Sequence, residues 1–131
     1  MAKISRDEIK KKGIKRFLRT FKFSYQGLKY AYANEQSMLT HLVLTIITVV
    51  LGFVLHVTLY EWLIIAISLT VILAFELINT AIEAAVDLCT LEIHPLAKIA
   101  KDCGSAATGV TSIMAAIIIL IILIPHFIAL F

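Results

Sequence analysis

The stretch that decides the fold is WLIIAISLTVILAFELINTAIEAAVD, residues 62–87. From Trp62 to Phe75 it carries no charged side chain. From Glu76 onward, four polar residues that share one helix face occur among apolar ones. These four are Glu76, Asn79, Glu83 and Asp87. At about 100° per residue of α-helix they lie within an arc of about 80°. The pattern predicts one transmembrane helix with a polar stripe, and ionisable residues inside a span are costly and usually functional.

Two further apolar stretches are long enough to cross a bilayer core of about 30 Å, which takes roughly 20 helical residues. The three expected spans cover about 38–57, 62–83 and 106–127 of a single domain, 1–131. Of the 131 residues, 60% are hydrophobic and 16% charged, against about 45–50% and about 25% in globular domains. These values exclude a disordered chain and argue against a water-soluble domain. We therefore predict an all-α integral membrane protein.

The basic residues are concentrated at one end of the chain. Ten of the twelve lysines and arginines precede residue 31, and the other two are Lys98 and Lys101. The distribution predicts that the N-terminus and the connection between the second and third spans are cytoplasmic and the C-terminus external. Apolar residues at helical spacing among the N-terminal basic ones predict an amphipathic surface segment, 1–33, on an anionic leaflet rather than a site for nucleic acid. They are Ile9, Ile14, Phe17, Leu18, Phe21, Tyr25 and Leu28, with a possible break at Gly27.

Polar groups of the other two spans are expected to reach the same level as the stripe. Glu35 directly precedes the first span. On the third helix, four polar side chains fall within about 60° of one another, with Asp102 adjoining them. These are Lys101, Ser105, Thr108 and Ser112. If Trp62 marks the external interface, Glu76 lies about 21 Å along the helix and Glu83 about 31 Å, which predicts a site with two levels, Glu76 being the deeper.

The chemistry expected at such a site is phosphoryl transfer. Carboxylates with a nearby amide are hard oxygen ligands that suit Mg²⁺, and a lysine helps to neutralise a triphosphate. A deeper carboxylate can accept a proton from a lipid hydroxyl. Asp87 is interpreted as a structural partner rather than a ligand, and Lys101 is also consistent with a charge that only sets orientation. His41 and His56 have no carboxylate at a relay spacing in the sequence, and no zinc-type cluster or H-E-x-x-H motif occurs.

The polar stripe resembles the signature of a known family. Glu76-Leu-Ile-Asn79-Thr80-Ala-Ile-Glu83-Ala-Ala-Val86-Asp87 resembles the motif of the small prokaryotic diacylglycerol kinases, and HPLAKIAKD, residues 94–102, resembles their second motif. Gly27 and Asn34-Glu35 fit the approach to the first span, so that the resemblance covers about residues 15–127. It implies a homotrimer of three-span protomers with a surface helix, sites between protomers, and transfer from Mg²⁺-ATP to a lipid in the bacterial plasma membrane. The absence of a Walker loop agrees.

The resemblance also implies a role for each matching residue. Glu76 would bind the acceptor hydroxyl as general base, and Ser105 would lie near the lipid headgroup. Glu35 and Glu83 would hold the metal. Residues implied to contact or lie near the nucleotide are Arg16, Glu35, Asn79, Glu83, Glu92, His94, Lys101 and Asp102.

Two lipid acceptors are implied by two branches of the family. Glu61-Trp62, His41 and the HPLAK stretch resemble the branch that phosphorylates undecaprenol, whereas Gly104-Ser105-Ala-Ala resembles the branch that phosphorylates diacylglycerol. We favour undecaprenol. Among other classes, a proton or ion translocator would need a polar path through the external half of the spans, which is apolar except for Thr45, Thr48 and Ser68. A membrane adaptor would not explain the aligned carboxylates.

Overall fold

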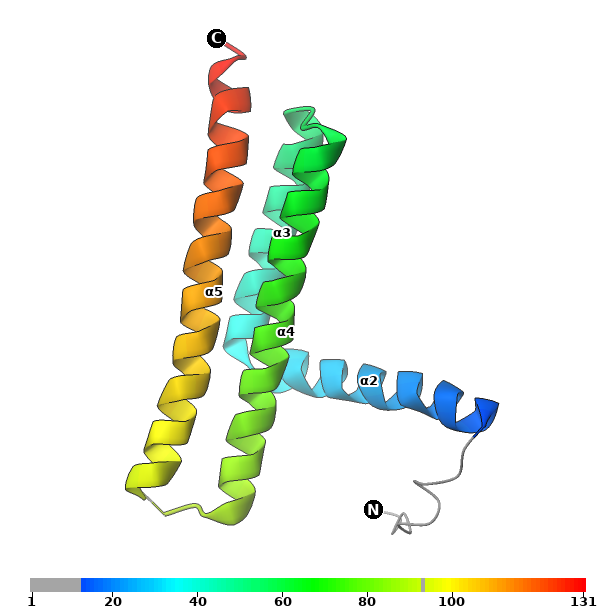
Figure 1. Ribbon diagram of the computed structural model, residues 1–131, viewed down its shortest axis with the longest axis vertical. Helices are drawn as coiled ribbons and strands as arrows, with labels where there is room; N and C mark the ends of the chain where they lie inside the picture. The colour runs from blue at the N-terminus through cyan, green and yellow to red at the C-terminus, as the bar shows by residue number, and fades with distance from the viewer. Residues whose placement is uncertain (1–12, 93) are drawn as a thin grey trace. The chain divides into compact units, whose positions relative to one another are not determined.

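The computed structural model describes residues 13–92 and 94–131, without the side chain of Lys15 (Figure 1). Within these ranges the chain forms the helices α2 (Ile14–Asn34), α3 (Gln36–Val54), α4 (Leu59–Cys89) and α5 (Pro95–Ile128), and no strand. The all-α prediction is confirmed. Ile9 and the basic residues that precede Gly13 belong to the predicted amphipathic segment but lie outside the described residues. The chain divides into two compact units, residues 1–34 and 35–131, which are described separately.

Helix α2 is continuous, and the possible break at Gly27 is not present. Most of its large apolar side chains are exposed, including Phe17, Phe21 and Tyr25. Phe17 and Phe21 lie one turn apart and their rings meet edge to face, 5.1 Å between centroids. A helix that carries both basic residues and exposed aromatic residues has the composition expected of a surface-lying segment.

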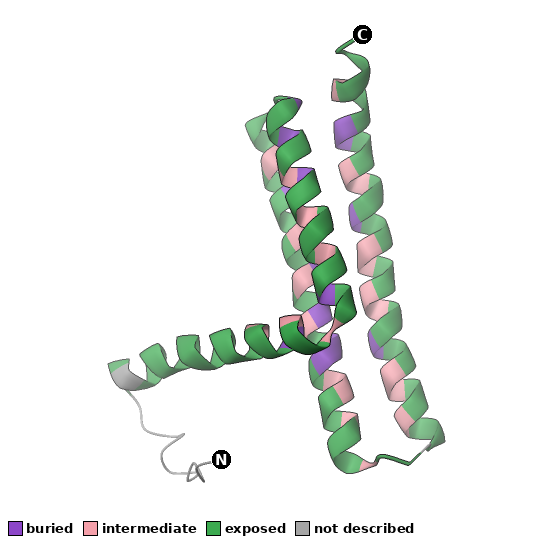
Figure 2. Ribbon diagram, turned by 180° about the vertical axis from the view of Figure 1, so that it is seen from behind, coloured by how far each residue is buried: buried purple, intermediate pink, exposed green. Residues whose placement is uncertain are grey.

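Helices α3, α4 and α5 are each long and apolar enough to cross a membrane, which confirms the three-span fold. They lie side by side, with α4 and α5 sharing the most extensive contact (Figure 1). At 1.5 Å per residue, the 31 residues of α4 extend about 46 Å, well beyond a hydrocarbon core of about 30 Å. Much of the surface of these helices is exposed (Figure 2). Most of their large apolar side chains are among the exposed residues, as expected where lipid replaces water as the solvent.

The turn between α3 and α4 is tightly specified. Helix α3 ends at Val54, three residues before the predicted end of the first span, because His56 adopts a left-handed backbone conformation with φ 52°. Thr58 and Glu61 then form a capping box: the Glu61 amide donates to the Thr58 hydroxyl, and the Thr58 amide donates to Oε2 of Glu61 at 2.7 Å. Nε2 of His126 lies 3.0 Å from the same carboxylate, which ties the end of α5 to the turn.

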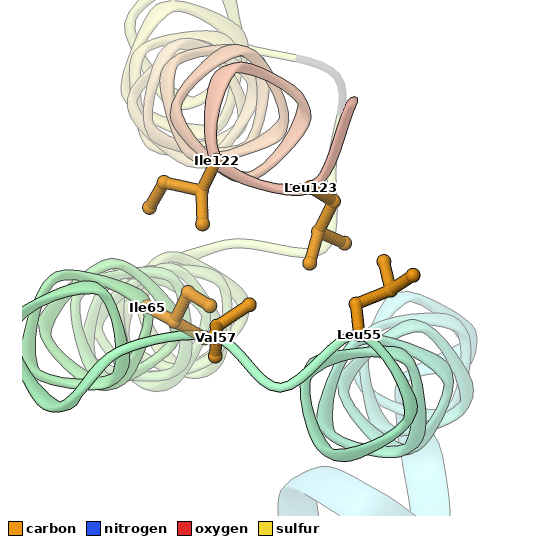
Figure 3. Close-up of a cluster of buried hydrophobic side chains, with 5 residues drawn as sticks. All are labelled: Leu55, Val57, Ile65, Ile122 and Leu123. Carbon is orange, nitrogen blue, oxygen red and sulfur yellow. The ribbon is translucent and has the colours of Figure 1, made fainter. Parts of the chain in front are cut away.

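The apolar core of the three-helix unit lies beside this turn. Figure 3 shows its five buried members, which come from the turn, from α4 and from α5. They are Leu55, Val57, Ile65, Ile122 and Leu123. Toward the other end of the unit, buried positions are increasingly occupied by polar side chains, among them Ser68, Glu76 and Asn79. The fold therefore has an apolar end at the α3–α4 turn and a polar end toward the α4–α5 connection.

Candidate functional site

Glu76 is the buried charge around which the polar half of the unit is arranged. It lies in the middle of α4 and only 3% of its surface is exposed. Both carboxylate oxygens have partners on α3: Ser37 donates its hydroxyl to Oε2 at 2.7 Å, and Nε2 of His41 lies 3.1 Å from Oε1. Ser37 and His41 are four residues apart, so one face of α3 presents both groups to the same carboxylate. An unpaired carboxylate here would cost several kcal/mol, and these contacts supply the missing partners.

The pairing of His41 with Glu76 corrects an interpretation of the sequence. The histidine has no carboxylate at a relay spacing within its own helix, but α4 brings one to it in space. Ser112 of α5 also approaches, with its hydroxyl oxygen 3.4 Å from Nε2 of His41. All three spans thus contribute to one polar cluster, and sequence analysis included only Glu76 and Ser112 among its site candidates.

Asn79 and Glu83 form the next level along the polar stripe. The Asn79 amide nitrogen donates to Oε1 of Glu83 at 2.9 Å, an i,i+4 contact. The Asn79 amide oxygen is buried and has no partner among the described residues. Gly104 of α5 packs directly against that oxygen, since a Cβ added at this glycine would collide with it. A buried acceptor without a partner is unusual in a native structure and is a position at which a ligand or ion can be bound.

A cleft of about 280 Å³ opens at the α4–α5 connection. The residues that line it come from the last turns of α4, the connection and the first turns of α5. They are Val86, Asp87, Thr90, Leu91, Glu92, His94, Ala97, Lys98, Lys101 and Asp102. Four of the residues predicted to contact or lie near the nucleotide are therefore brought together here: Glu92, His94, Lys101 and Asp102.

One ion pair joins the two walls of this cleft, and a second lies within α5. The Lys101 ammonium donates to Asp87 at 2.5 Å across the two helices, and Lys98 pairs with Asp102 one turn along α5. Asp87 is thus a structural partner, as the sequence suggested. His94 is the N-cap of α5, where its Nδ1 accepts from the Leu96 amide at 3.2 Å, and Pro95 at the first helical position favours this start. The cleft is lined by apolar side chains, by two lysines and by three carboxylates, and each lysine is paired with one of those carboxylates.

Three predicted site residues stand apart from these contacts. Glu35 is the half-buried N-cap of α3, and its side chain makes no capping bond. Ser105 is exposed on α5, and its carbonyl accepts from the Thr108 hydroxyl. Arg16 is exposed on α2, which belongs to the other compact unit. No hydrogen bond or ion pair within residues 13–92 and 94–131 joins Glu35 to Glu83.

The donor set fits Mg²⁺ that arrives with a nucleotide. The part of the chain that the structure describes contains no cluster of three or more histidine, cysteine or acidic side chains able to hold a metal. Mg²⁺ does not need one, because it is commonly held by one or two carboxylates together with substrate phosphates and water. The Glu83 carboxylate, whose Oε1 accepts from the Asn79 amide nitrogen, provides a hard oxygen donor of this kind.

Comparison with known proteins identifies the class to which this fold and site belong. Residues 22–123 match the family described as prokaryotic diacylglycerol kinase. The chain is 34% identical over 112 residues to "Undecaprenol kinase" of Bacillus subtilis (strain 168), covering 86% of this chain and 91% of that protein. It is 39% identical over 98 residues to "Diacylglycerol kinase" of Helicobacter pylori (strain J99), covering 75% and 77% respectively. "Diacylglycerol kinase" of Escherichia coli (strain K12) is 34% identical over 115 residues, covering 88% and 94%.

The chain belongs to the prokaryotic diacylglycerol kinase family. It is a membrane lipid kinase, a transferase that uses ATP and a lipid hydroxyl acceptor. The expectation of a lipid kinase drawn from the polar stripe of α4 is confirmed.

Proposed function

We propose that the protein transfers the γ-phosphate of ATP to undecaprenol, with Glu76 as the general base. The catalytic part of this proposal rests on the buried Glu76 carboxylate in the polar half of the unit. Each of its two oxygens has a partner on α3. A general base must be ionised, oriented and within reach of the proton that it removes. Glu76 is oriented by two partners on α3, and in this proposal the acceptor hydroxyl reaches it from the bilayer.

The reaction follows from the two levels of the site. Glu76 removes the proton from the lipid hydroxyl, and the hydroxyl oxygen attacks the γ-phosphorus of ATP. The bond from that phosphorus to the β–γ bridging oxygen breaks, and ADP leaves with the electron pair. The products are the lipid phosphate and ADP, and Glu76 returns its proton to solvent before the next turnover.

The nucleotide is proposed to occupy the cleft at the α4–α5 connection, with its phosphates toward Glu83 and Asn79. Lys101 and Asp102 contact it, Glu92 and His94 lie beside it, and Arg16 of α2 reaches the phosphates. Glu35 and Glu83 would hold Mg²⁺, which offsets charge on the phosphates when bound. What supports this assignment is the convergence of four of these residues, Glu92, His94, Lys101 and Asp102, on one cleft.

The proposed setting is the bacterial plasma membrane with the α4–α5 connection on the cytoplasmic side. Lys98 and Lys101 at that connection and the basic N-terminal segment support this orientation, because basic residues favour the cytoplasmic side. Helix α2 lies along the same leaflet. We further propose a homotrimer with sites between protomers, in which Glu35 and Ser105 meet groups of a neighbouring chain. Three helices are too few to enclose both a nucleotide and a lipid.

The choice of acceptor rests on sequence features. Glu61-Trp62, His41 and HPLAK match the pattern of undecaprenol kinases, and the B. subtilis relative carries that name. Diacylglycerol is the second candidate, since Gly104-Ser105-Ala-Ala matches the other pattern and the relatives from H. pylori and E. coli are named for it.

Purified full-length protein with labelled ATP, Mg²⁺ and mixed micelles tests the acceptor. Separate reactions contain undecaprenol or diacylglycerol, and kcat/KM is measured for each. Undecaprenol should give the higher value. A higher value for diacylglycerol would reverse the acceptor assignment, and no phosphorylated lipid from either would contradict the proposed function as a whole. Co-assembly of inactive Glu35→Gln and Glu76→Gln protomers tests the shared site, because recovered activity requires residues from different chains.

A further inference from the structure

We propose that His41 is a positioning residue for Glu76: its Nε2–H orients the carboxylate that accepts the proton of the lipid hydroxyl. The inference rests on the proposed function, since it assigns a role in that reaction to a residue outside the sequence motifs. It is drawn from the contacts between α3 and α4.

The geometry distinguishes the two oxygens of Glu76. Oε2 accepts the neutral hydroxyl of Ser37 at 2.7 Å, and Oε1 faces Nε2 of His41 at 3.1 Å. Among the described residues, His41 is the basic side chain that comes within ion-pair distance of this carboxylate. Each carboxylate oxygen has two lone pairs, so that both contacts leave acceptor capacity for the substrate proton.

The low solvent exposure of Glu76 and His41 strengthens the hydrogen bond between them. The side chain of Glu76 is 4% exposed and that of His41 is 23% exposed, so little water competes for either group. In such surroundings hydrogen bonds are stronger than in water, and an unpaired charge is costly. Ser112, at 3.4 Å from the same Nε2, is the more distant neighbour. We therefore assign the Nε2 proton to the bond with Glu76, an assignment that leaves Nδ1 unprotonated in the neutral ring.

A set of substitutions at one position separates positioning from packing. His41→Gln places an amide donor close to the position of Nε2, whereas His41→Leu fills similar space without a donor. Thr45→Val, one turn further along α3 and likewise half-buried, is the matched control. Each full-length variant is purified in mixed micelles, and kcat and the KM for ATP are measured with saturating lipid.

The expected result is a loss in kcat alone. His41→Leu should lower kcat about 10- to 100-fold, the effect of losing one hydrogen bond to a charged group, while the KM for ATP stays unchanged. His41→Gln should recover most of the loss, and Thr45→Val should behave as the unaltered protein. Because leucine and glutamine differ in the donor more than in volume, their comparison separates the loss of the donor from a change in packing.

Two outcomes would overturn the inference. Equal kcat values for His41→Leu and His41→Gln would show that the donor is irrelevant, and a loss confined to the KM for ATP would place His41 in nucleotide binding. Either result leaves the kinase activity of the unaltered protein intact. Failure of the unaltered protein to phosphorylate either lipid would instead contradict the proposed function.

Discussion

Glu76→Gln is the substitution that most directly tests the site. Glutamine is nearly isosteric with glutamate, and its amide oxygen can still accept from Ser37, as the carboxylate does at 2.7 Å. Its amide nitrogen, which is a donor, can bond to Nε2 of His41 only after the imidazole proton has moved to Nδ1. The substitution therefore keeps the shape of the side chain and the Ser37 contact but removes the basic oxygen. General-base catalysis contributes about 10²- to 10⁴-fold to a rate, so kcat should fall by about this factor, equivalent to about 2.7–5.4 kcal/mol in the activation barrier.

The assay measures phosphate transfer and nucleotide binding on the same preparation. Turnover is followed with labelled ATP and lipid in mixed micelles, and Mg²⁺-ATP affinity is measured by equilibrium binding without lipid. The affinity should be unchanged, because Glu76 is not among the residues that line the cleft proposed for the nucleotide. A loss of Mg²⁺-ATP affinity as large as the loss of kcat would refute the reasoning, since Glu76 would then belong to the nucleotide site.

Three further substitutions give separate tests. Glu83→Gln should keep the hydrogen bond from Asn79 but remove a charged oxygen proposed to bind Mg²⁺, and so raise the KM for Mg²⁺-ATP about tenfold or more. An unchanged KM in a Mg²⁺ titration would show that Glu83 is not a metal ligand. Gly52→Ala should destabilise the protein by about 1–3 kcal/mol, because its Cβ would meet the Trp62 ring at 2.7 Å. Gly109→Ala, with open space around it, is the control for thermal unfolding in micelles, and equal midpoints would exclude the clash. Glu61→Ala should lower the unfolding midpoint more than Glu61→Gln, because glutamine preserves the capping box; equal losses would show that the cap is unimportant.

The membrane fold was predictable because it depends on properties that are local in sequence. Each span contains a long run of mostly apolar residues, and a helix in lipid satisfies its own backbone hydrogen bonds. The exact ends were less predictable. The left-handed residue His56 ends α3 early, and the long α4 and α5 continue beyond their apolar portions into the polar connection.

The α4 part of the site was predictable for a related reason. Glu76, Asn79 and Glu83 follow the period of one helix, so that their common face can be read from spacing alone. The bond between Asn79 and Glu83 is of this local kind. The close approach of Gly104 to Asn79 is not, because it depends on how α5 packs against α4. The spacing of residues along a helix shows which of them share a face. It does not show which residues of another helix pack against that face.

His41 shows where this limit matters for function. No carboxylate lies three or four residues from His41, so the histidine is interpreted as having no acidic partner. Comparing the polar residues of adjacent spans, rather than of one helix, would have found the contact. Ser37 and His41 form an i,i+4 polar pair within an apolar span, just as Glu76 and Asn79 form an i,i+3 pair within another. Since polar groups in lipid are costly unless paired, two such pairs on adjacent spans should face each other. The observed bonds from Ser37 and His41 to Glu76 agree with this rule, which uses only sequence and the order of the spans.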